Sequence, residues 1–276
     1  MLSTLVLVLA FAFAQDAVAQ YYFNDIVARQ QASDYHAILE KQGVTKVTAR
    51  AFERGNRPAE DFVLEQTLSN GASLVTTTSN TQGKPTVTRT EYNNGRLYKT
   101  TESALNVLTE TSYSYGANGL LQELTIASTD TFMQAKSVER HLWYYNEAGN
   151  PSRMLKIKDG VDSTVVTFVY DEKGNVAEEK WMRKGRNTET YYYYYNTDKR
   201  LTDIVRFNYK AQRMLPDFIY EYDDKGRVTK LTQIPSGSSS YLIWTYTYND
   251  RGLKETETCT TKFREPLILI RYRYEF

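Results

Sequence analysis

A short turn that begins with tyrosine recurs along most of this chain, and it constrains the fold more than any other feature. The fullest copy is Tyr222-Asp223-Asp224-Lys225-Gly226-Arg227-Val228, and degraded copies begin at Tyr92, Tyr115, Tyr145, Tyr170, Tyr195 and Tyr248. Successive tyrosines are 23, 30, 25, 25, 27 and 26 residues apart. A self-match at a nearly fixed period indicates a repeat architecture.

Each repeat has the pattern of a β-hairpin. Asp or Asn after the tyrosine can bond to the backbone two residues on, and Gly adopts the positive φ that such a turn needs. Alternating apolar residues flank the turn, which is typical of paired strands. Residues two and four positions before the turn tyrosine share a strand face. This face is aromatic or β-branched in most repeats, and its members include Tyr113, Trp143, Phe168, Tyr193, Tyr220, Tyr246 and Tyr272.

A single hairpin is only marginally stable in water, so neighbouring repeats must stack to share their aromatic face. We therefore predict an all-β fold, an antiparallel β-meander of repeated hairpins that forms a long curled or twisted sheet. The repeats predict roughly sixteen strands. Whether the sheet is open, curled or closed is left undecided by the pattern.

The N-terminal region has a different composition. Residues 1–19 resemble a signal peptide, with an uncharged apolar run and small residues before cleavage after Ala19 or Ala14. A secreted, periplasmic or cell-surface location follows from this prediction. Residues 20–43 are spaced for a helix that is interrupted near Ser33-Asp34 and ended by Gly43. We expect this N-terminal helix to pack on, or to cap, the first edge of the sheet.

The repeat domain is predicted to fill residues 44–276. A first strand is expected over Val44 to Phe52, followed by a polar loop from Arg54 to Asp61 that contains Pro58. Later turns are expected at Asn70-Gly71 and at residues 82–85.

The pattern Tyr-Asp-x-x-Gly-Arg-Val resembles the YD repeat of the RHS family. Tyr222 to Val228 and Tyr170 to Val176 match it most closely, and the resemblance covers Thr86 to Phe276. In that family the repeats form long curling antiparallel sheets on secreted or cell-surface proteins, some of which wrap a toxin. The resemblance implies a short secreted YD-repeat protein without a toxin domain.

Catalytic and metal-binding patterns are sparse in the sequence. Cys259 is the single cysteine and lies in a strand pattern without a nearby His, which predicts a half-buried strand thiol. His36 and His141 are far apart in sequence, and His141 stands in the aromatic column, where we expect it to pack. The acidic turns are better explained by turn formation than by calcium. We expect no metal and no cofactor.

Surface aromatics suggest one binding hypothesis. In the run Tyr191 to Tyr195, the odd-numbered residues belong to the shared column, whereas Tyr192 and Tyr194 face the other side with Tyr144. Exposed tyrosines can bind sugars or peptides by stacking and by hydroxyl hydrogen bonds. Cross-strand packing that stabilises the sheet is the competing interpretation.

These observations predict a non-enzymatic binding or scaffold protein of the cell envelope, with a glycan or a surface protein as its partner. A formal charge of +1 provides no electrostatic reason to expect nucleic acid. One alternative is an outer-membrane β-barrel, because Ile268 to Phe276 alternates like a closing strand. The polar strands Val176 to Met182 and Leu253 to Thr260 argue against lipid contact, so we expect no membrane-spanning strand. A second alternative is a glycan-acting enzyme that uses a pair of Asp or Glu residues.

Overall fold

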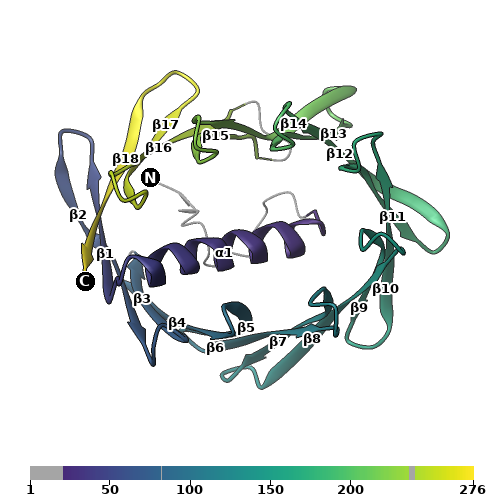
Figure 1. Cartoon of the computed structure of the whole chain (residues 1–276), viewed down its shortest axis with the longest axis horizontal. Coiled ribbons are helices and arrows are strands. Elements are labelled where there is room, and N and C mark those ends of the chain that lie inside the picture. The colour runs from purple at the N-terminus through teal and green to yellow at the C-terminus, as the bar shows by residue number, and fades with distance from the viewer. Residues whose placement is uncertain (1–20, 82, 236–239) are drawn as a thin grey trace.

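The chain folds as a closed β-barrel with a helix inside it (Figure 1). The computed structural model describes residues 21–81, 83–235 and 240–276. The predicted signal peptide, residues 1–19, lies outside the described residues, as does Gln20. The elements are α1 (Asn24–Lys41), β1 (Lys46–Glu53), β2 (Arg57–Ser69), β3 (Leu74–Thr81), β4 (Lys84–Asn93), β5 (Arg96–Ala104), β6 (Val107–Tyr115), β7 (Leu121–Asp130), β8 (Ala135–Tyr145), β9 (Pro151–Lys158), β10 (Asp162–Tyr170), β11 (Val176–Arg183), β12 (Arg186–Tyr195), β13 (Leu201–Asn208), β14 (Arg213–Tyr222), β15 (Val228–Gln233), β16 (Leu242–Tyr248), β17 (Lys254–Thr261) and β18 (Pro266–Glu275).

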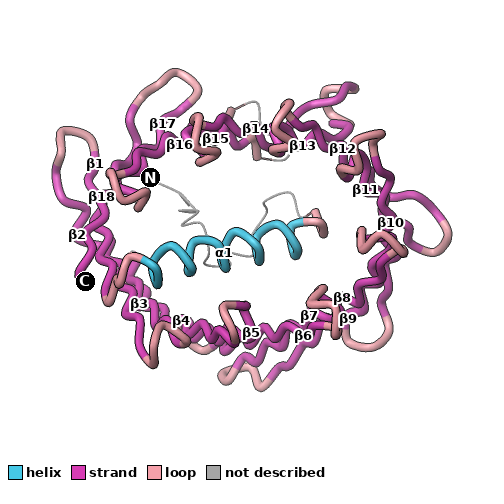
Figure 2. Tube along the Cα trace, viewed as in Figure 1, coloured by secondary structure: helices cyan, strands magenta, loops and turns pink. Residues whose placement is uncertain are grey.

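Every strand pairs antiparallel with the next one along the chain, and β18 pairs with β1. In this last pair Val47 lies opposite Tyr274, and Ala51 lies opposite Ile270. The all-β antiparallel meander predicted from the repeats is confirmed, and the ladder between β1 and β18 closes it into a ring (Figure 2). β18 places Tyr272 in the repeated aromatic column and also forms the closing pair with β1.

The described residues form eighteen strands, whereas the repeats predicted about sixteen. The loop predicted from Arg54 to Asp61 is also shorter than expected, because residues 57–61 continue β2. Pro58 is tolerated there because it lies opposite Phe52, where a register shift between Arg50 and Phe52 already disturbs the ladder. Proline lacks an N–H donor and is therefore placed most easily at such an irregularity.

The turn chemistry predicted from the repeat is confirmed. Asp223 Oδ1 accepts hydrogen bonds from the backbone N–H groups of Lys225 at 3.0 Å and Arg227 at 2.9 Å. Gly226 has φ of +82°, the left-handed conformation that the turn requires. Asn249 makes the equivalent bonds to Arg251 and Leu253.

The turn tyrosine has a second role that links neighbouring repeats. Its hydroxyl donates to a backbone carbonyl at the start of the strand that follows the preceding turn. The pairs with their O–O distances are Tyr145 to Leu121 (2.7 Å), Tyr222 to Leu201 (2.6 Å), Tyr248 to Val228 (2.8 Å) and Tyr274 to Lys254 (2.6 Å), and Tyr115 to Leu97 and Tyr170 to Pro151 are bonded in the same way. Each bond fixes one hairpin against the one before it.

The helix α1 crosses the interior of the ring instead of capping a sheet edge (Figure 1). The prediction of an edge cap was wrong because the ladder between β1 and β18 leaves no edge to cover. The helix runs without a break through Ser33 and Asp34, and Gly43, with φ of +70°, follows its end as predicted. Within the described residues, no helix combines the length and apolarity needed to cross a membrane.

The aromatic column points inward and forms the core together with the start of the helix. Tyr113, Trp143, Tyr193 and Phe218 are buried in one cluster with Tyr21 and Tyr22. The Tyr21 ring centroid lies 5.9 Å from that of Tyr193 and 6.0 Å from that of Phe218. Aromatic pairs at such distances contribute beyond simple burial.

The bond between repeats can be tested with Tyr222→Phe, which removes the hydroxyl and leaves the Leu201 carbonyl without this donor. We expect a loss of about 1 kcal/mol in the free energy of unfolding. Urea unfolding followed by circular dichroism measures it. The matched control is Tyr209→Phe, because Tyr209 is 68% exposed in a turn. Equal losses in the two variants would contradict the assigned role of the Tyr222 hydroxyl.

Candidate functional site

The tyrosines predicted to bind a ligand lie on the outer wall and do not converge. Tyr192 and Tyr194 are on β12, and Tyr144, which is 40% exposed, is on β8. Four strand spacings separate β8 from β12, a distance of about 19 Å. The Arg153 guanidinium covers the Tyr144 ring at 4.3 Å. The three residues therefore do not form one site, and ligand binding at any of them stays a prediction.

A shallow pocket brings Tyr192 together with two aromatic residues that the sequence pattern did not single out. Its volume is about 160 Å³, and its lining includes Tyr192, Phe207, Tyr209, Thr188 and Thr190. Phe207 comes from the neighbouring strand β13, and Tyr209 comes from the turn after it. Flat apolar rings beside hydroxyl groups can hold one sugar ring by stacking and hydrogen bonding.

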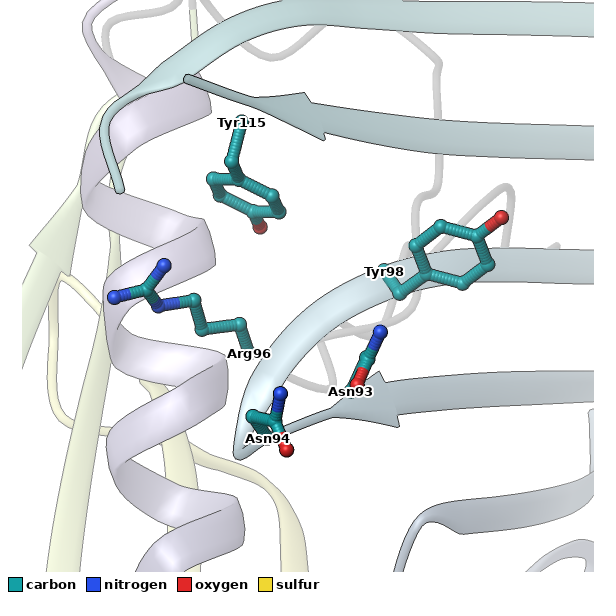
Figure 3. A pocket seen from close by; sticks show the side chains of 5 residues that line it. All are labelled: Asn93, Asn94, Arg96, Tyr98 and Tyr115. Atoms are coloured by element: carbon teal, nitrogen blue, oxygen red, sulfur yellow. The ribbon is translucent and has the colours of Figure 1, made fainter. Parts of the chain in front are cut away.

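A second small pocket, of about 150 Å³, lies at the turn between β4 and β5 (Figure 3). Asn93, Asn94 and Arg96 supply amide and guanidinium groups, and Tyr98 and Tyr115 supply aromatic walls. Both pockets are below the usual size of a small-molecule site, which is about 300–1,000 Å³.

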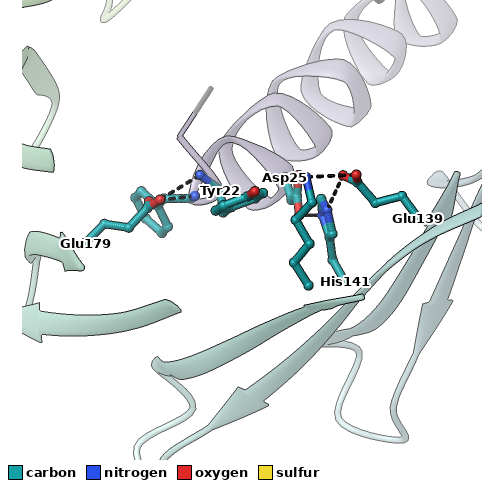
Figure 4. A network of polar contacts seen from close by, with 7 residues as sticks. Tyr22, Asp25, Glu139, His141 and Glu179 are labelled. Carbon is teal, nitrogen blue, oxygen red and sulfur yellow. Dashed lines mark hydrogen bonds and ion pairs between the residues drawn. The ribbon is translucent and has the colours of Figure 1, made fainter. Parts of the chain in front are cut away.

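The most elaborate polar arrangement lies inside the barrel, where the helix begins (Figure 4). The Glu179 carboxylate, on β11, accepts from the backbone N–H groups of Tyr22 at 2.7 Å and Phe23 at 2.9 Å. It also accepts from Trp181 Nε1 at 2.5 Å and from the Tyr193 hydroxyl at 2.6 Å. An anion at a helix N-terminus binds donors that the helix itself leaves unpaired. Burial raises the pKa of Glu179, and the four donors offset that effect only in part.

His141, on β8, joins the same end of the helix through two carboxylates (Figure 4). Its Nδ1 lies 2.6 Å from Asp25 Oδ2 in the first turn of the helix, and its Nε2 lies 2.8 Å from Glu139 Oε1. Burial would lower the pKa of His141, but the two carboxylates outweigh it and raise the pKa to about 9. Burial would likewise raise the pKa of Glu139, yet hydrogen bonds from His141 and Lys156 hold it at about 2.

The charge state of His141 decides what this network can do chemically. An imidazole with a pKa near 9 is protonated at neutral pH, whereas a general base must be neutral to accept a proton. His141 is also only 4% exposed. The arrangement is that of an ionic anchor for the helix. His141 thus lies in the buried column as predicted, but it is held by ion pairs in addition to packing.

The other end of the helix is anchored mainly by apolar contacts. Leu39 is buried in a cluster with Val47, Leu68, Val75 and Leu253. The His36 ring stacks on Tyr92 with centroids 3.7 Å apart, and its Nε2 lies 2.6 Å from the Ala72 carbonyl oxygen. The helix is therefore fixed at both ends against different parts of the wall.

The repeat register contains a signal for Glu179 that the pattern analysis missed. In the six repeats that begin at Tyr115 to Tyr248, the position nine residues after the turn tyrosine is a buried or half-buried apolar residue in four, namely Leu124, Met154, Ile204 and Leu231. Glu179 and Glu257 occupy this same position and are 0% and 1% exposed. Glu257 accepts from the Tyr272 hydroxyl at 2.8 Å and is paired with Lys254. An acid in an otherwise apolar column indicates a buried polar contact.

Cys259 also faces the interior, on β17, and is fully buried. Burial raises the pKa of its thiol to about 12. The predicted strand position is confirmed, but the thiol is fully buried where half-burial was predicted. A protonated thiol of this kind is a poor nucleophile.

The outer wall carries charges near the middle of several strands. Lys99 Nζ lies 2.6 Å from Glu110 Oε2 across β5 and β6, and Arg140 Nε lies 2.7 Å from Glu123 Oε1 across β8 and β7. Their sequence neighbours Thr100, Thr111, Leu124 and His141 are buried inside, so these four charges point outward. Further outward pairs are Lys46–Glu65, Lys180–Glu178 and Lys230–Glu221.

Comparisons with known proteins show similarity only in structure. No protein-family model and no curated protein matches the sequence. A porin-like protein from Bacteroides uniformis is 12% identical with a TM-score of 0.39, over 84% of this chain and 96% of that one. A chain of the Photorhabdus luminescens Tc holotoxin pore is 14% identical with a TM-score of 0.31, over 81% of this chain and 14% of that one. A chain of a TcdB2–TccC3–Cdc42 complex is 13% identical with a TM-score of 0.31, over 77% and 15%.

These identities and TM-scores are too low to assign a family or a function. Two of these structures are chains of Tc toxin complexes. The resemblance to YD repeats does not depend on them, because it rests on the turn residues of this sequence.

The ionic anchor predicts a pH dependence of stability. Because the pKa of His141 rises from 6.5 to about 9 on folding, its stabilisation is complete below pH 6.5 and disappears as the pH rises through 9. We expect a contribution on the order of 3 kcal/mol, which His141→Gln lacks. Urea unfolding of both proteins between pH 6 and pH 10 measures the difference. A difference that stays constant over this range would contradict the anchor.

Proposed function

We propose that this chain is a non-enzymatic binding or scaffold protein of the cell envelope, built as a barrel that faces water on its outer wall. The observation that supports the proposal most directly is the set of ion pairs on that wall, near the middle of the strands. A charge at the bilayer midplane costs about 2–4 kcal/mol on a lipid-facing strand. Several such charges in different parts of the ring oppose insertion.

The closed ring of the described residues agrees better with a barrel than with an open binding sheet. A closed ring is also the architecture of an outer-membrane barrel, which is therefore the second candidate function. The specific observation in its favour is the eighteen-stranded antiparallel ring of the described residues, closed by β1 and β18. The ion pairs on the outer wall support the first candidate.

The proposed envelope location rests on residues 1–19, whose pattern is that of a signal peptide. The absence of catalysis is also part of the proposal. It is supported by the roles of the polar groups inside the barrel, since Glu179, His141 and Asp25 bond to the helix or to one another.

A glycan is the proposed small ligand, and the Tyr192 pocket is its proposed site. Tyr192, Phe207 and Tyr209 provide stacking surfaces, and Thr188 and Thr190 provide hydroxyl groups beside them. Tyr194 lies two residues farther along the same outer column of β12 and can extend the contact.

Solubility tests the water-facing wall. We expect residues 20–276, produced without the signal peptide and without detergent, to remain in solution and unfold cooperatively on heating. The ion-paired outer wall needs no lipid or detergent to cover it. Aggregation without detergent, together with heat-modifiable migration of native protein extracted from outer membranes, would favour the inserted barrel.

Glycan binding is tested by Tyr192→Ala on a glycan array. We expect at least a tenfold loss of affinity for any glycan that the wild-type protein binds, because the central stacking ring is removed. The control is Tyr144→Ala, which removes an outward tyrosine on a different part of the wall. Equal binding by wild type and Tyr192→Ala would eliminate this site.

A further inference from the structure

The two rims of the barrel differ sharply in composition. In an antiparallel meander, alternate turns lie at opposite ends of the barrel. One rim, named the YD rim, is formed by the turns of the tyrosine repeat, each of which joins an even-numbered strand to the next, from β2–β3 to β16–β17. The other rim, named the apolar rim, is formed by the turns that join an odd-numbered strand to the next, from β1–β2 to β17–β18. The yellow β17–β18 hairpin of the apolar rim flares outward from the ring (Figure 1).

Large apolar side chains project from five of the described turns of the apolar rim. Their exposed fractions are 70% for Leu105, 81% for Phe132, 72% for Met133, 88% for Val161, 68% for Tyr209 and 74% for Phe263. On the wall next to these tips, Leu108, Val138, Phe207 and Met214 are exposed as well. The apolar surface therefore continues about two residues, or about 7 Å, down the outside of the barrel. Isolated exposed apolar residues are common, but a circle of them at one end of a molecule indicates a contact surface.

Turn formation does not explain these residues. Leu105 has φ of +52°, a conformation that Asn or Gly adopts at lower cost than Leu. In the β7–β8 turn, Asp130 Oδ1 accepts from the backbone N–H groups of Phe132 and Met133, so the turn is made without their side chains. In the β17–β18 turn, Thr261 Oγ1 accepts from the N–H of Phe263 in the same way.

Basic residues stand between and beside the apolar tips. The exposed basic residues at this rim include Arg54, Lys84, Lys136, Lys158, Lys184, Arg186, Lys210, Arg213 and Arg264. Among the side chains that the structure describes at these turns, the exposed acids are fewer, namely Glu53, Asp159 and Glu265. The formal charge of the whole chain is only +1, so the basic excess at this rim is a local property.

The YD rim is a natural comparison within the same molecule. At its tips acids and bases alternate, as in Glu172-Lys173, Asp198-Lys199, Asp224-Lys225 and Asp250-Arg251, and all of these residues are exposed. The four tips have no large apolar side chain of their own, and the one large exposed apolar ring that the structure describes beside them is Phe276, 57% exposed and 4.2 Å from the Arg251 guanidinium. Repeat geometry is shared by both rims, so it does not account for the difference between them.

We propose that the apolar rim docks the barrel, end on, onto the surface of an anionic lipid bilayer. The apolar zone, which extends about 7 Å down the wall from the tips, matches the 5–10 Å depth of the boundary between headgroups and acyl chains. Lys and Arg beside them lie at the level of the phosphate groups, where each adds attraction to an anionic surface. The outer wall stays in water above the membrane, and the binding is peripheral.

Vesicle flotation tests the proposal with the full chain from residue 20. The probes are vesicles of phosphatidylcholine alone and vesicles of phosphatidylcholine mixed with phosphatidylglycerol. We expect flotation with the mixed vesicles, little with the neutral ones, and release by high salt because the attraction is screened. Failure to bind either kind of vesicle would overturn the proposal and leave a protein partner as the occupant of this rim. Resistance to extraction by salt and by alkaline carbonate would also overturn it, since an inserted barrel behaves in that way.

Paired variants separate the rim from the rest of the surface. Phe132→Ser with Phe263→Ser, and separately Lys184→Glu with Lys210→Glu, should each lower the vesicle partition coefficient at least tenfold. The matched controls are Tyr98→Ser with Tyr194→Ser on the wall, and Lys173→Glu with Lys225→Glu on the YD rim. The controls should bind as wild type does. Equal losses in a rim variant and its control would overturn the assignment of the rim, and unchanged circular dichroism verifies that each variant is folded.

Discussion

The bond from the turn tyrosine to the previous repeat, present in six repeats, is the interaction on which the rest of the structure depends. The Tyr222 hydroxyl bonds to the Leu201 carbonyl, and the Tyr248 hydroxyl bonds to the Val228 carbonyl, so one contact is reproduced at successive steps. The arginine after the turn glycine adds to it, because the Arg227 guanidinium lies 4.4 Å from the Tyr248 ring centroid. A barrel closes only when strand tilt and stagger are consistent around the ring. Identical contacts between repeats supply that consistency.

Closure creates an interior that the chain must fill. The inward aromatic column surrounds α1, and the helix is fixed by a carboxylate at its beginning and by an apolar cluster near its end. A buried carboxylate is strongly unfavourable unless it is fully hydrogen bonded. Glu179 meets that condition with four donors, two of which are backbone N–H groups that a helix start leaves unpaired. The position of the helix and the burial of the acid therefore depend on each other.

The exterior divides into surfaces of different chemistry. The wall carries ion pairs, the YD rim is balanced in charge, and the apolar rim combines basic and apolar side chains. A closed barrel has no free sheet edge, so association through edge strands is excluded within the ring. The surfaces left for recognition are the two rims and shallow sites on the wall, such as the pocket at Tyr192. This division is compatible with a protein that binds and positions other components.

The sequence by itself determined the repeat, the hairpin, the inward aromatic face and the turn chemistry, because these depend on residues close together in the chain. It also placed Cys259 and the outward Tyr192 and Tyr194 correctly, since strand alternation decides which face a residue occupies. Only the tertiary structure decided that β18 meets β1, that α1 lies inside the ring, and that Tyr144 is remote from Tyr192. The network of Asp25, His141 and Glu179 likewise joins segments more than a hundred residues apart. Contacts at such separation are set by the number and curvature of the strands around the ring, and no local pattern contains that information.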